Sequence, residues 1–408
     1  MTRATRRATA PPKDPYGLGP ARPYVGPVLA LVALVVVGLI TLSLMNGQLP
    51  FNIGSGGGTG NGGDGGPART PAPSNQVIVE PDVAFPGTIV YAKAGNIWVQ
   101  SGTDVRQLTD SGRDSMPTFS PDGKDVYFIR EGTGKAKHRA GNVYTWFDQQ
   151  TPELVRVPAD GSEKPVQVVS GRIRDGNDRW FFWMREPSVA PDGHTIAVVS
   201  DGPNPRESEV VVQNYDTETG AFTKPETPIG IGHQDPAWAP DGRYLAFVKN
   251  DRAGSRGMPQ ILKWNPENGR VFTITGPGYL APAWSPDSKY LAATKTNSFG
   301  TDIVILDSVT GVELLRLTND GNSFSPVWSP AGDAVAFLRL NGAITDLVMV
   351  KLDGAPGDWT VGEETSLTEV SGLDAGSRPG WFIPASELPE RPATSSPGTP
   401  SAAPTTAP

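Results

Sequence analysis

Short apolar runs separated by turn residues recur along most of the chain, in six segments that resemble one another. A typical segment has a proline, an inner strand, a turn and a second apolar strand, as in PAWAPDGRYLAFVK from Pro236. The opening prolines lie 70, 49, 46, 44 and 53 residues apart, at Pro117, Pro187, Pro236, Pro282, Pro326 and Pro379. A spacing in the forties is typical of a four-stranded blade, so the pattern predicts an all-β propeller.

The turn between the first two strands is Pro-Asp-Gly in three segments, at 121–123, 191–193 and 240–242. Proline presets φ at the first corner, aspartate bonds back to the backbone, and glycine takes the left-handed position. A tryptophan recurs two residues after four of the opening prolines, at Trp238, Trp284, Trp328 and Trp381. We expect these rings to wedge between neighbouring blades.

The two ends of the repeat region complement each other. Residues 87–109 supply three strands with no inner strand before them, and the last repeat, from Arg378, supplies an inner strand and then stops at Pro384. Together they make one blade beside five internal ones. The sequence therefore predicts a six-bladed β-propeller over residues 85–384, closed by pairing of its N- and C-terminal strands.

Residues 25–45 carry no charge and are long enough to cross a bilayer as a helix. The basic side chains before them outnumber the single acid, Asp14. By the positive-inside rule this predicts a single-pass anchor in the cytoplasmic membrane, with residues 1–24 as a basic segment inside and the propeller outside (extracytoplasmic). A cleaved signal peptide is the alternative.

Two segments of low complexity flank the predicted propeller. Residues 46–84 are rich in glycine and then proline, and residues 385–408 are almost entirely Pro, Ser, Thr and Ala. Such compositions cannot bury enough apolar surface to offset the entropy of ordering. We expect a disordered stem before the propeller and a disordered tail after it.

The composition excludes several kinds of site. A net charge of −8 argues against nucleic-acid binding, and the absence of cysteine excludes a thiolate nucleophile or a disulfide framework. The three histidines lie far apart in the sequence. We therefore expect no metal and no cofactor.

The segments end in patterns such as Arg106-Gln-Leu-Thr109 and Arg316-Leu-Thr318. With the repeated P-x-W-S-P-D-G core, the chain resembles the TolB-type propeller family over roughly residues 85–384. The resemblance implies the fold. Proteins of this type include periplasmic partners of outer-membrane lipoproteins and the propeller halves of prolyl-oligopeptidase-like enzymes. The chain shows neither TolB's N-terminal α/β domain nor a hydrolase domain, so neither activity is carried over.

Two long loop insertions, 131–150 and 171–186, leave one blade on the face that carries the second-to-third-strand loops and the blade-to-blade loops. They are rich in arginine and aromatic residues, the types that dominate interface hot spots. The alternative is a small satellite core with solvated arginines around it. The predicted binding face comprises Lys135, Lys137, His138, Arg139, Trp146, Arg172, Arg174, Arg179, Trp180, Trp183 and Arg185.

A second candidate site is the mouth of the central channel, at the start of the inner strands. Its predicted residues are Asp114, Glu186, His233, Asp235, Asp374 and Arg378. Carboxylates and a histidine converging on an axis could hold a metal ion or a small polar ligand, although such funnels are often simply wet and polar.

No hydrolase elbow, zinc-protease helix or phosphate loop is present, so no catalytic residue is assigned. We therefore expect a monomeric, non-enzymatic scaffold that binds a protein or an envelope polymer through the insertions. The alternative is a glycan-processing propeller, of hydrolase or lyase type, that uses acidic residues in the funnel.

Overall fold

The computed structural model describes residues 84–388, except 141–142, 176–177, 204–210, 226–231 and 251–257. The predicted basic segment and anchor, the stem up to residue 83 and the tail from residue 389 lie outside the described residues. Within the described part of the chain, no helix is both long and apolar enough to span a membrane.

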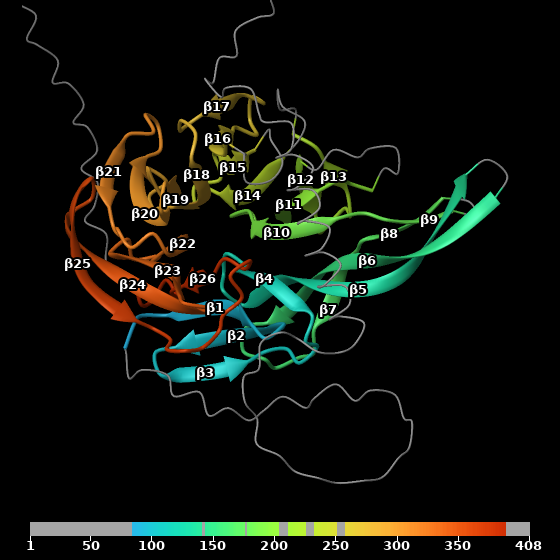
Figure 1. Ribbon diagram of the computed structural model, residues 1–408, viewed down its shortest axis with the longest axis horizontal. Helices are drawn as coiled ribbons and strands as arrows, with labels where there is room; N and C mark the ends of the chain where they lie inside the picture. Colours follow the sequence, from blue (N-terminus) through green and yellow to red (C-terminus); the bar gives the residue numbers. More distant parts are fainter. Residues whose placement is uncertain are drawn as a thin grey trace, which may run out of the picture. The chain divides into compact units, whose positions relative to one another are not determined.

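Six antiparallel sheets make up the described chain, and we number them as blades 1 to 6 (Figure 1). Blade 1 contains β26 (Gly380–Phe382), β1 (Thr88–Lys93), β2 (Asn96–Ser101) and β3 (Asp104–Gln107). Blade 2 contains β4 (Asp114–Phe119), β5 (Asp125–Ala140), β6 (Val143–Pro158) and β7 (Val166–Ser170), with β8 (Arg172–Asp175) and β9 (Asp178–Phe181) added.

The other four blades have four strands each. Blade 3 contains β10 (Met184–Val189), β11 (Thr195–Ser200), β12 (Val211–Asp216) and β13 (Phe222–Thr223). Blade 4 contains β14 (His233–Trp238), β15 (Leu245–Lys249), β16 (Gln260–Trp264) and β17 (Val271–Thr273). Blade 5 contains β18 (Tyr279–Trp284), β19 (Tyr290–Asn297), β20 (Gly300–Asp307) and β21 (Glu313–Arg316). Blade 6 contains β22 (Ser323–Trp328), β23 (Ala334–Asn341), β24 (Ile344–Ala355) and β25 (Asp358–Ser366).

The six inner strands, β4, β10, β14, β18, β22 and β26, contact one another in succession and form a ring. β26 also pairs with β1, with Ile89 opposite Trp381, so blade 1 combines strands from both ends of the described chain. The predicted all-β fold with six blades is confirmed.

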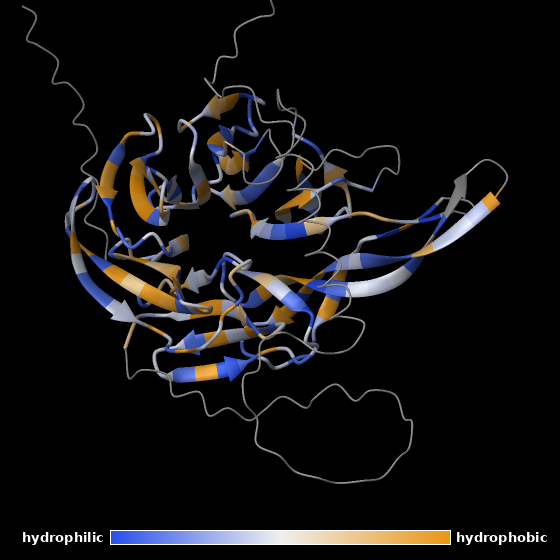
Figure 2. Cartoon of the chain, in the orientation of Figure 1, coloured by the Kyte–Doolittle hydropathy of each residue, from blue (hydrophilic) through white to orange (hydrophobic). Residues whose placement is uncertain are grey.

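Six apolar clusters form the core, and each lies between two neighbouring blades. Alternation along a strand serves both sides of a blade: Val335 and Phe337 face blade 5, whereas Ala336 and Leu338 face blade 1. Strands buried on both faces read as continuous apolar runs. In Figure 2 such a run marks β24, while the outermost strand β3 is mostly hydrophilic.

The tryptophans confirm the expected wedges. Trp284 is buried in the cluster between blades 4 and 5, and its Nε1 donates to the carbonyl of Ala237 at 2.9 Å. Trp328 is buried in the same way between blades 5 and 6.

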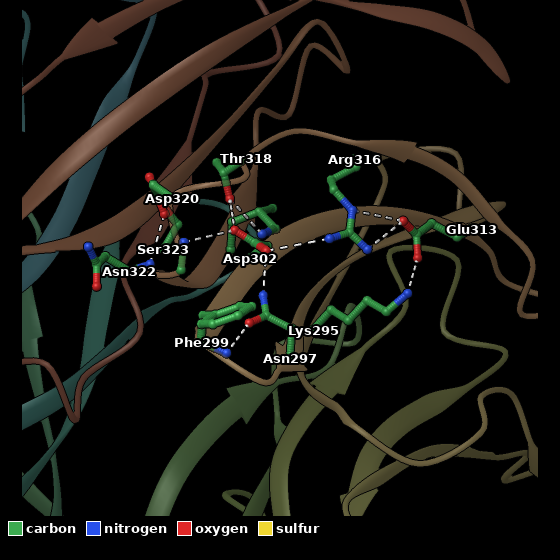
Figure 3. A network of polar contacts seen from close by, with 12 residues as sticks. Lys295, Asn297, Phe299, Asp302, Glu313, Arg316, Thr318, Asp320, Asn322 and Ser323 are labelled. Carbon is green, nitrogen blue, oxygen red and sulfur yellow. Dashed lines mark hydrogen bonds and ion pairs between the residues drawn. The ribbon is translucent and has the colours of Figure 1, made fainter.

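The Leu-Thr ending of a repeat closes the corner of its blade, as Figure 3 shows for blade 5. The Asp302 carboxylate is buried and accepts hydrogen bonds from Thr318 Oγ1 (3.3 Å), the Gly321 backbone N–H (3.1 Å) and Asn297 Nδ2 (2.6 Å). Thr318 Oγ1 also accepts from the N–H of Ile303 at 3.0 Å. This corner ties the β19–β20 hairpin to the linker that enters blade 6.

The described chain continues four residues beyond Pro384. Residues 385–388 form a turn, and Leu388 packs against the cluster between blades 6 and 1.

Candidate functional site

The two insertions of blade 2 form extended strands, not the loops that we expected. β5 and β6 pair from Asp125↔Pro158 to Ala140↔Val143, well beyond the edge of the blade. The second insertion folds into the β8–β9 hairpin, and β9 pairs with β5 at Lys137↔Arg179. We call residues 131–150 together with β8 and β9 the arm; it projects to the right in Figure 1.

The arm can form because the inner strand β4 stops pairing with β5 at Arg130. β4 pairs with β5 only as far as Arg130, so this edge of β5 is available beyond that point, and β9 takes it. Gly134 allows the close approach of this second hairpin, because a Cβ there would lie 2.7 Å from the ring of Phe181.

Cross-strand pairing places three cations in a row on the arm. Arg174 lies opposite Arg179, Arg179 opposite Lys137, and Lys137 opposite Trp146. Directly opposite residues share a face of a sheet, and like charges in that arrangement are destabilising. Among the described side chains, no carboxylate forms an ion pair with these three cations; on the same face Lys135 pairs with Asp148 at 2.8 Å. As far as the described side chains go, no ion pair offsets the positive charge of this row.

Aromatic rings border this row. Lys137 Nζ lies 4.2 Å from the ring centroid of Tyr144 and 5.5 Å from that of Trp146, and the Arg179 guanidinium lies 5.8 Å from Trp146. Trp146 is nevertheless 49% exposed and Tyr144 38%. These rings do not form a satellite core; they hold the cations by cation–π contacts and leave large apolar surface available.

The base of the arm is held by alternating charges. Arg130 on β5 makes two bonds to the fully buried carboxylate of Asp114, at 2.7 and 2.9 Å. On the neighbouring strands Glu153 pairs with Arg172 at 3.5 Å. Asp114, predicted for the funnel, and Arg172, predicted for the binding face, thus both lie at this base. Sequence reasoning missed Glu153, which the alternation along β6 could have indicated.

The other predicted binding residues divide into three groups. Trp183 is 45% exposed and lies 5.9 Å from the Arg185 guanidinium, where the chain leaves the arm for blade 3. Trp180 is partly buried. His138 and Arg139 belong to β5, and their side chains lie outside the described residues.

The inner strands enclose a central cavity of about 720 Å³. Its lining combines prolines and aromatic rings with polar and charged side chains. The rings are Phe119, Trp238, Trp284, Trp328, Trp381 and Phe382.

Of the six predicted funnel residues, Glu186, Asp235 and Arg378 line this cavity. Arg378 lies 3.9 Å from the Asp235 carboxylate and donates to the carbonyl of Pro282 at 2.7 Å. Asp374 lies in the preceding turn and accepts a bond from Ser377 Oγ.

His233 and Asp114 do not face the cavity. His233 is buried between blades, where Nδ1 accepts from the N–H of Val212 at 3.1 Å and its ring lies 4.7 Å from that of Phe247. Both residues stand two positions before a bulge, which changes the direction of the side chains along the inner strand.

The bulge residue stands directly before the opening proline of the repeat and adopts a left-handed conformation in five blades, at Met116, Glu186, Asp235, Ala281 and Ser325. This conformation directs its N–H toward a neighbouring blade. The N–H of Asp235 donates to Glu186 Oε2 at 2.6 Å, and the N–H of Ala281 donates to Asp235 Oδ2 at 3.0 Å. The cavity carboxylates therefore fasten adjacent inner strands together.

Burial, with a smaller contribution from the neighbouring Asp235 carboxylate, raises the pKa of Glu186 to about 7. Its side chain can therefore exchange a proton near neutral pH. Over the described part of the chain, no group of three His, Cys, Asp or Glu residues could hold a metal ion.

Residues 178–363 match the family described as the TolB beta propeller domain. The uncharacterized protein Atu1656 of Agrobacterium fabrum is 30% identical over 160 residues, which are 37% of this chain and 45% of that protein. The uncharacterized peptidase YuxL of Bacillus subtilis is 34% identical over 93 residues, 22% of this chain and 14% of that one. The chain thus spans less than half the length of either relative.

Among solved structures, TolB from Acinetobacter baumannii is similar with a TM-score of 0.52 and 20% identity, over 72% of this chain and 66% of that chain. A likeness at this identity concerns the fold. Six blades, the Pro-Asp-Gly turns, the Leu-Thr corners and the family match agree with one another. The described chain is a six-bladed β-propeller, and its residues 178–363 match the TolB beta propeller domain.

Proposed function

We propose that this protein is a non-enzymatic scaffold that binds a protein or cell-envelope polymer through the arm of blade 2. The observation that carries the proposal is the row of Arg174, Arg179 and Lys137, which no described ion pair offsets, beside exposed Tyr144 and Trp146. Arginine and large aromatic side chains supply most of the binding energy in protein interfaces. A rigid scaffold that extends one blade this way presents them at a fixed spacing.

The proposal includes a location outside the cytoplasmic membrane, with residues 25–45 as the anchor. Its support is the uncharged length of that segment and the basic residues before it. Because the chain has no cysteine, Ser401→Cys introduces a single thiol. We expect a membrane-impermeant maleimide to label this variant on intact cells. Labelling only after lysis would contradict the location.

The arm can be shortened without disturbing its register. Gly134 lies directly opposite Gln149, so residues 135–148 can be replaced by Asn-Gly, which forms a two-residue hairpin turn. We expect crosslinking of the full-length protein in its native membrane to yield a partner that is lost in this variant.

The matched control is shortening of the β24–β25 hairpin, which also extends beyond its blade. Replacement of Ala355–Asp358 by Asn-Gly should leave the crosslinked partner unchanged. Capture of the same partner by the arm-shortened protein, with its thermal unfolding intact, would refute the proposal.

A second candidate, a glycan-processing propeller, is favoured by one observation, the raised pKa of Glu186 in the central cavity. A carboxyl group that is protonated near neutral pH is what a general acid requires. This candidate predicts turnover of a cell-wall glycan that is abolished in Glu186→Gln and retained in the arm-shortened protein. The scaffold proposal predicts turnover in neither.

A further inference from the structure

The arm has an open sheet edge, formed by the part of β6 that extends beyond its pairing with β7. Away from β5, β6 pairs with β7 only at Glu153–Arg156, as far as the described residues go. The ten-residue stretch from Val143 to Pro152 pairs with β5 on its other side throughout. At the opposite edge of the arm, β8 has only four residues.

The register identifies which backbone groups point to this edge. The carbonyl of Pro152 accepts the N–H of Gly171 at 3.1 Å and therefore points away from β5. Inward and outward residues alternate along an antiparallel strand. The N–H and C=O groups of Tyr144, Trp146, Asp148 and Gln150 accordingly point away from β5. Glu131, opposite Pro152, agrees with this register, because its N–H points away from β6 to the carbonyl of Arg113 at 2.8 Å.

The residues with outward backbone groups also carry their side chains on the cationic face, opposite Arg139, Lys137 and Lys135. Lys137 leans over the Tyr144 and Trp146 rings, toward this edge. On the other face of the arm Phe147 is 42% exposed. A strand added beside β6 would meet cations and aromatic rings on one face and an apolar ring on the other.

The described charges of the cationic face indicate that the partner is negatively charged. Lys135, Lys137, Arg174 and Arg179 stand against two carboxylates, Asp148, which Lys135 neutralises, and the partly buried Glu131 at the base of the arm. A long, aromatic edge strand is a ready template for another chain. Natural edges are usually blocked by charges, a proline or a bulge; between 143 and 151 the edge has one charge, Asp148, which is paired with Lys135, no proline, and no bulge in its pairing with β5.

We propose that the edge of β6 from Tyr144 to Gln150 binds an extended segment of an acidic partner polypeptide as an added strand. Acidic side chains of the segment face Lys137 and Arg179, and apolar ones alternate with them beside Phe147. An extended polypeptide presents N–H and C=O groups at the same spacing as the unpaired groups of this edge, which favours a protein over an envelope polymer. This inference rests on the proposed function, because it assigns the chemistry of the partner of the same arm.

The probe for the test is a blocked octapeptide of alternating Glu and Val, titrated onto the full chain. Single-residue amide exchange is measured with and without it. We expect new protection at Tyr144, Trp146, Asp148 and Gln150, and little change at Thr145 and Phe147, whose amides already bond to β5. Binding without protection of the four outward amides would overturn strand addition.

Two variants at one position isolate the backbone contribution. Asp148→Ala and Asp148→Pro both remove the ion pair to Lys135, but only proline removes the outward N–H. We expect the proline variant to bind the probe about tenfold more weakly than the alanine variant, which is about 1.4 kcal/mol. Equal affinities would overturn the proposal. Amide exchange of the free variants verifies that the hairpin stays folded.

Charge reversal and alternative occupants complete the test. Lys137→Glu should lose about tenfold in affinity for the Glu-Val peptide and gain affinity for its Lys-Val counterpart. Comparable binding of polyphosphate, or dimerisation of the free chain with protection of the same four amides, would overturn the acidic polypeptide as occupant. In these cases the arm would still be a binding surface. The proposed function itself would be refuted if the arm-shortened protein captured every crosslinked partner as well as the wild type does.

Discussion

Blades 2 and 5 are built on the same repeat, yet their second and third strands end differently. In blade 5 the β19–β20 hairpin turns at Asn297–Gly300 and is fastened by the buried Asp302 carboxylate (Figure 3). In blade 2 the position of Asp302 is occupied by Glu153, opposite Arg130 as Asp302 is opposite Lys295. Glu153 pairs outward with Arg172 and makes no such corner, and the hairpin continues into the arm.

Blades 5 and 6 thus close this corner with a buried carboxylate in addition to apolar packing, since in blade 6 Asp346 accepts from Thr368 Oγ1 and from the N–H of Ser371. In blade 2 the longer Glu153 side chain pairs with Arg172 instead, and the hairpin extends into the arm. Three predictions test this comparison.

The largest effect is expected at the two equivalent acids. Asp302→Ala leaves the Gly321 N–H and the Asn297 amide without their acceptor and should lower the free energy of unfolding by about 3 kcal/mol. Glu153→Ala removes a half-exposed ion pair and should cost no more than about 1 kcal/mol. Chemical denaturation measures both. Equal losses would break the comparison.

The inner strand β10 of blade 3 has Glu186 at its bulge, and this side chain should make the stability of the protein depend on pH. In blade 5 the equivalent bulge residue is Ala281, which does not titrate. The folded protein binds the Glu186 proton more tightly than the unfolded chain, because burial raises this pKa from 4.5 to about 7. The resulting stability is fully present below pH 4.5 and is lost as the pH rises through 7.

Glu186→Gln should therefore be more stable than the wild type at pH 8, by at most about 3 kcal/mol, and the difference should vanish below pH 4.5. Thermal unfolding across pH 4 to 8 measures it. Replacement of the exposed Glu218 by Gln is the control and should leave the profile unchanged. A wild type that gains stability between pH 5 and 8 relative to Glu186→Gln would contradict the assignment.

The smallest effect concerns two threonines of the compared blades. Thr318→Val removes the hydroxyl that joins Asp302 to the N–H of Ile303 and should cost about 1 kcal/mol. Thr145→Val, on the exposed arm, should change the free energy of unfolding by less than about 0.5 kcal/mol. A Thr145 variant that destabilises as much as Thr318→Val would mean that the arm is part of the cooperative core.

The repeat could be recognised in the sequence, but the direction of every side chain could not be predicted from it. Asp114 and Glu186 both stand near the start of an inner strand, and only Glu186 lines the cavity. The reason is the bulge with its left-handed residue, which breaks the alternation that places i and i+2 on one face. Sequence reasoning found the arginine and aromatic residues of the arm, but it expected loops where two hairpins form.

The six-bladed propeller and its one elaborated blade could be predicted from the sequence, because proline spacing, turn chemistry and apolar alternation are local properties of the chain. The tertiary structure decided which of the singled-out residues meet. Lys137 and Arg179 are 42 positions apart and become neighbours only because β4 stops pairing at Arg130 and β9 takes its place. Cross-strand pairing between distant segments depends on which edges the rest of the fold leaves open, and no local pattern records that.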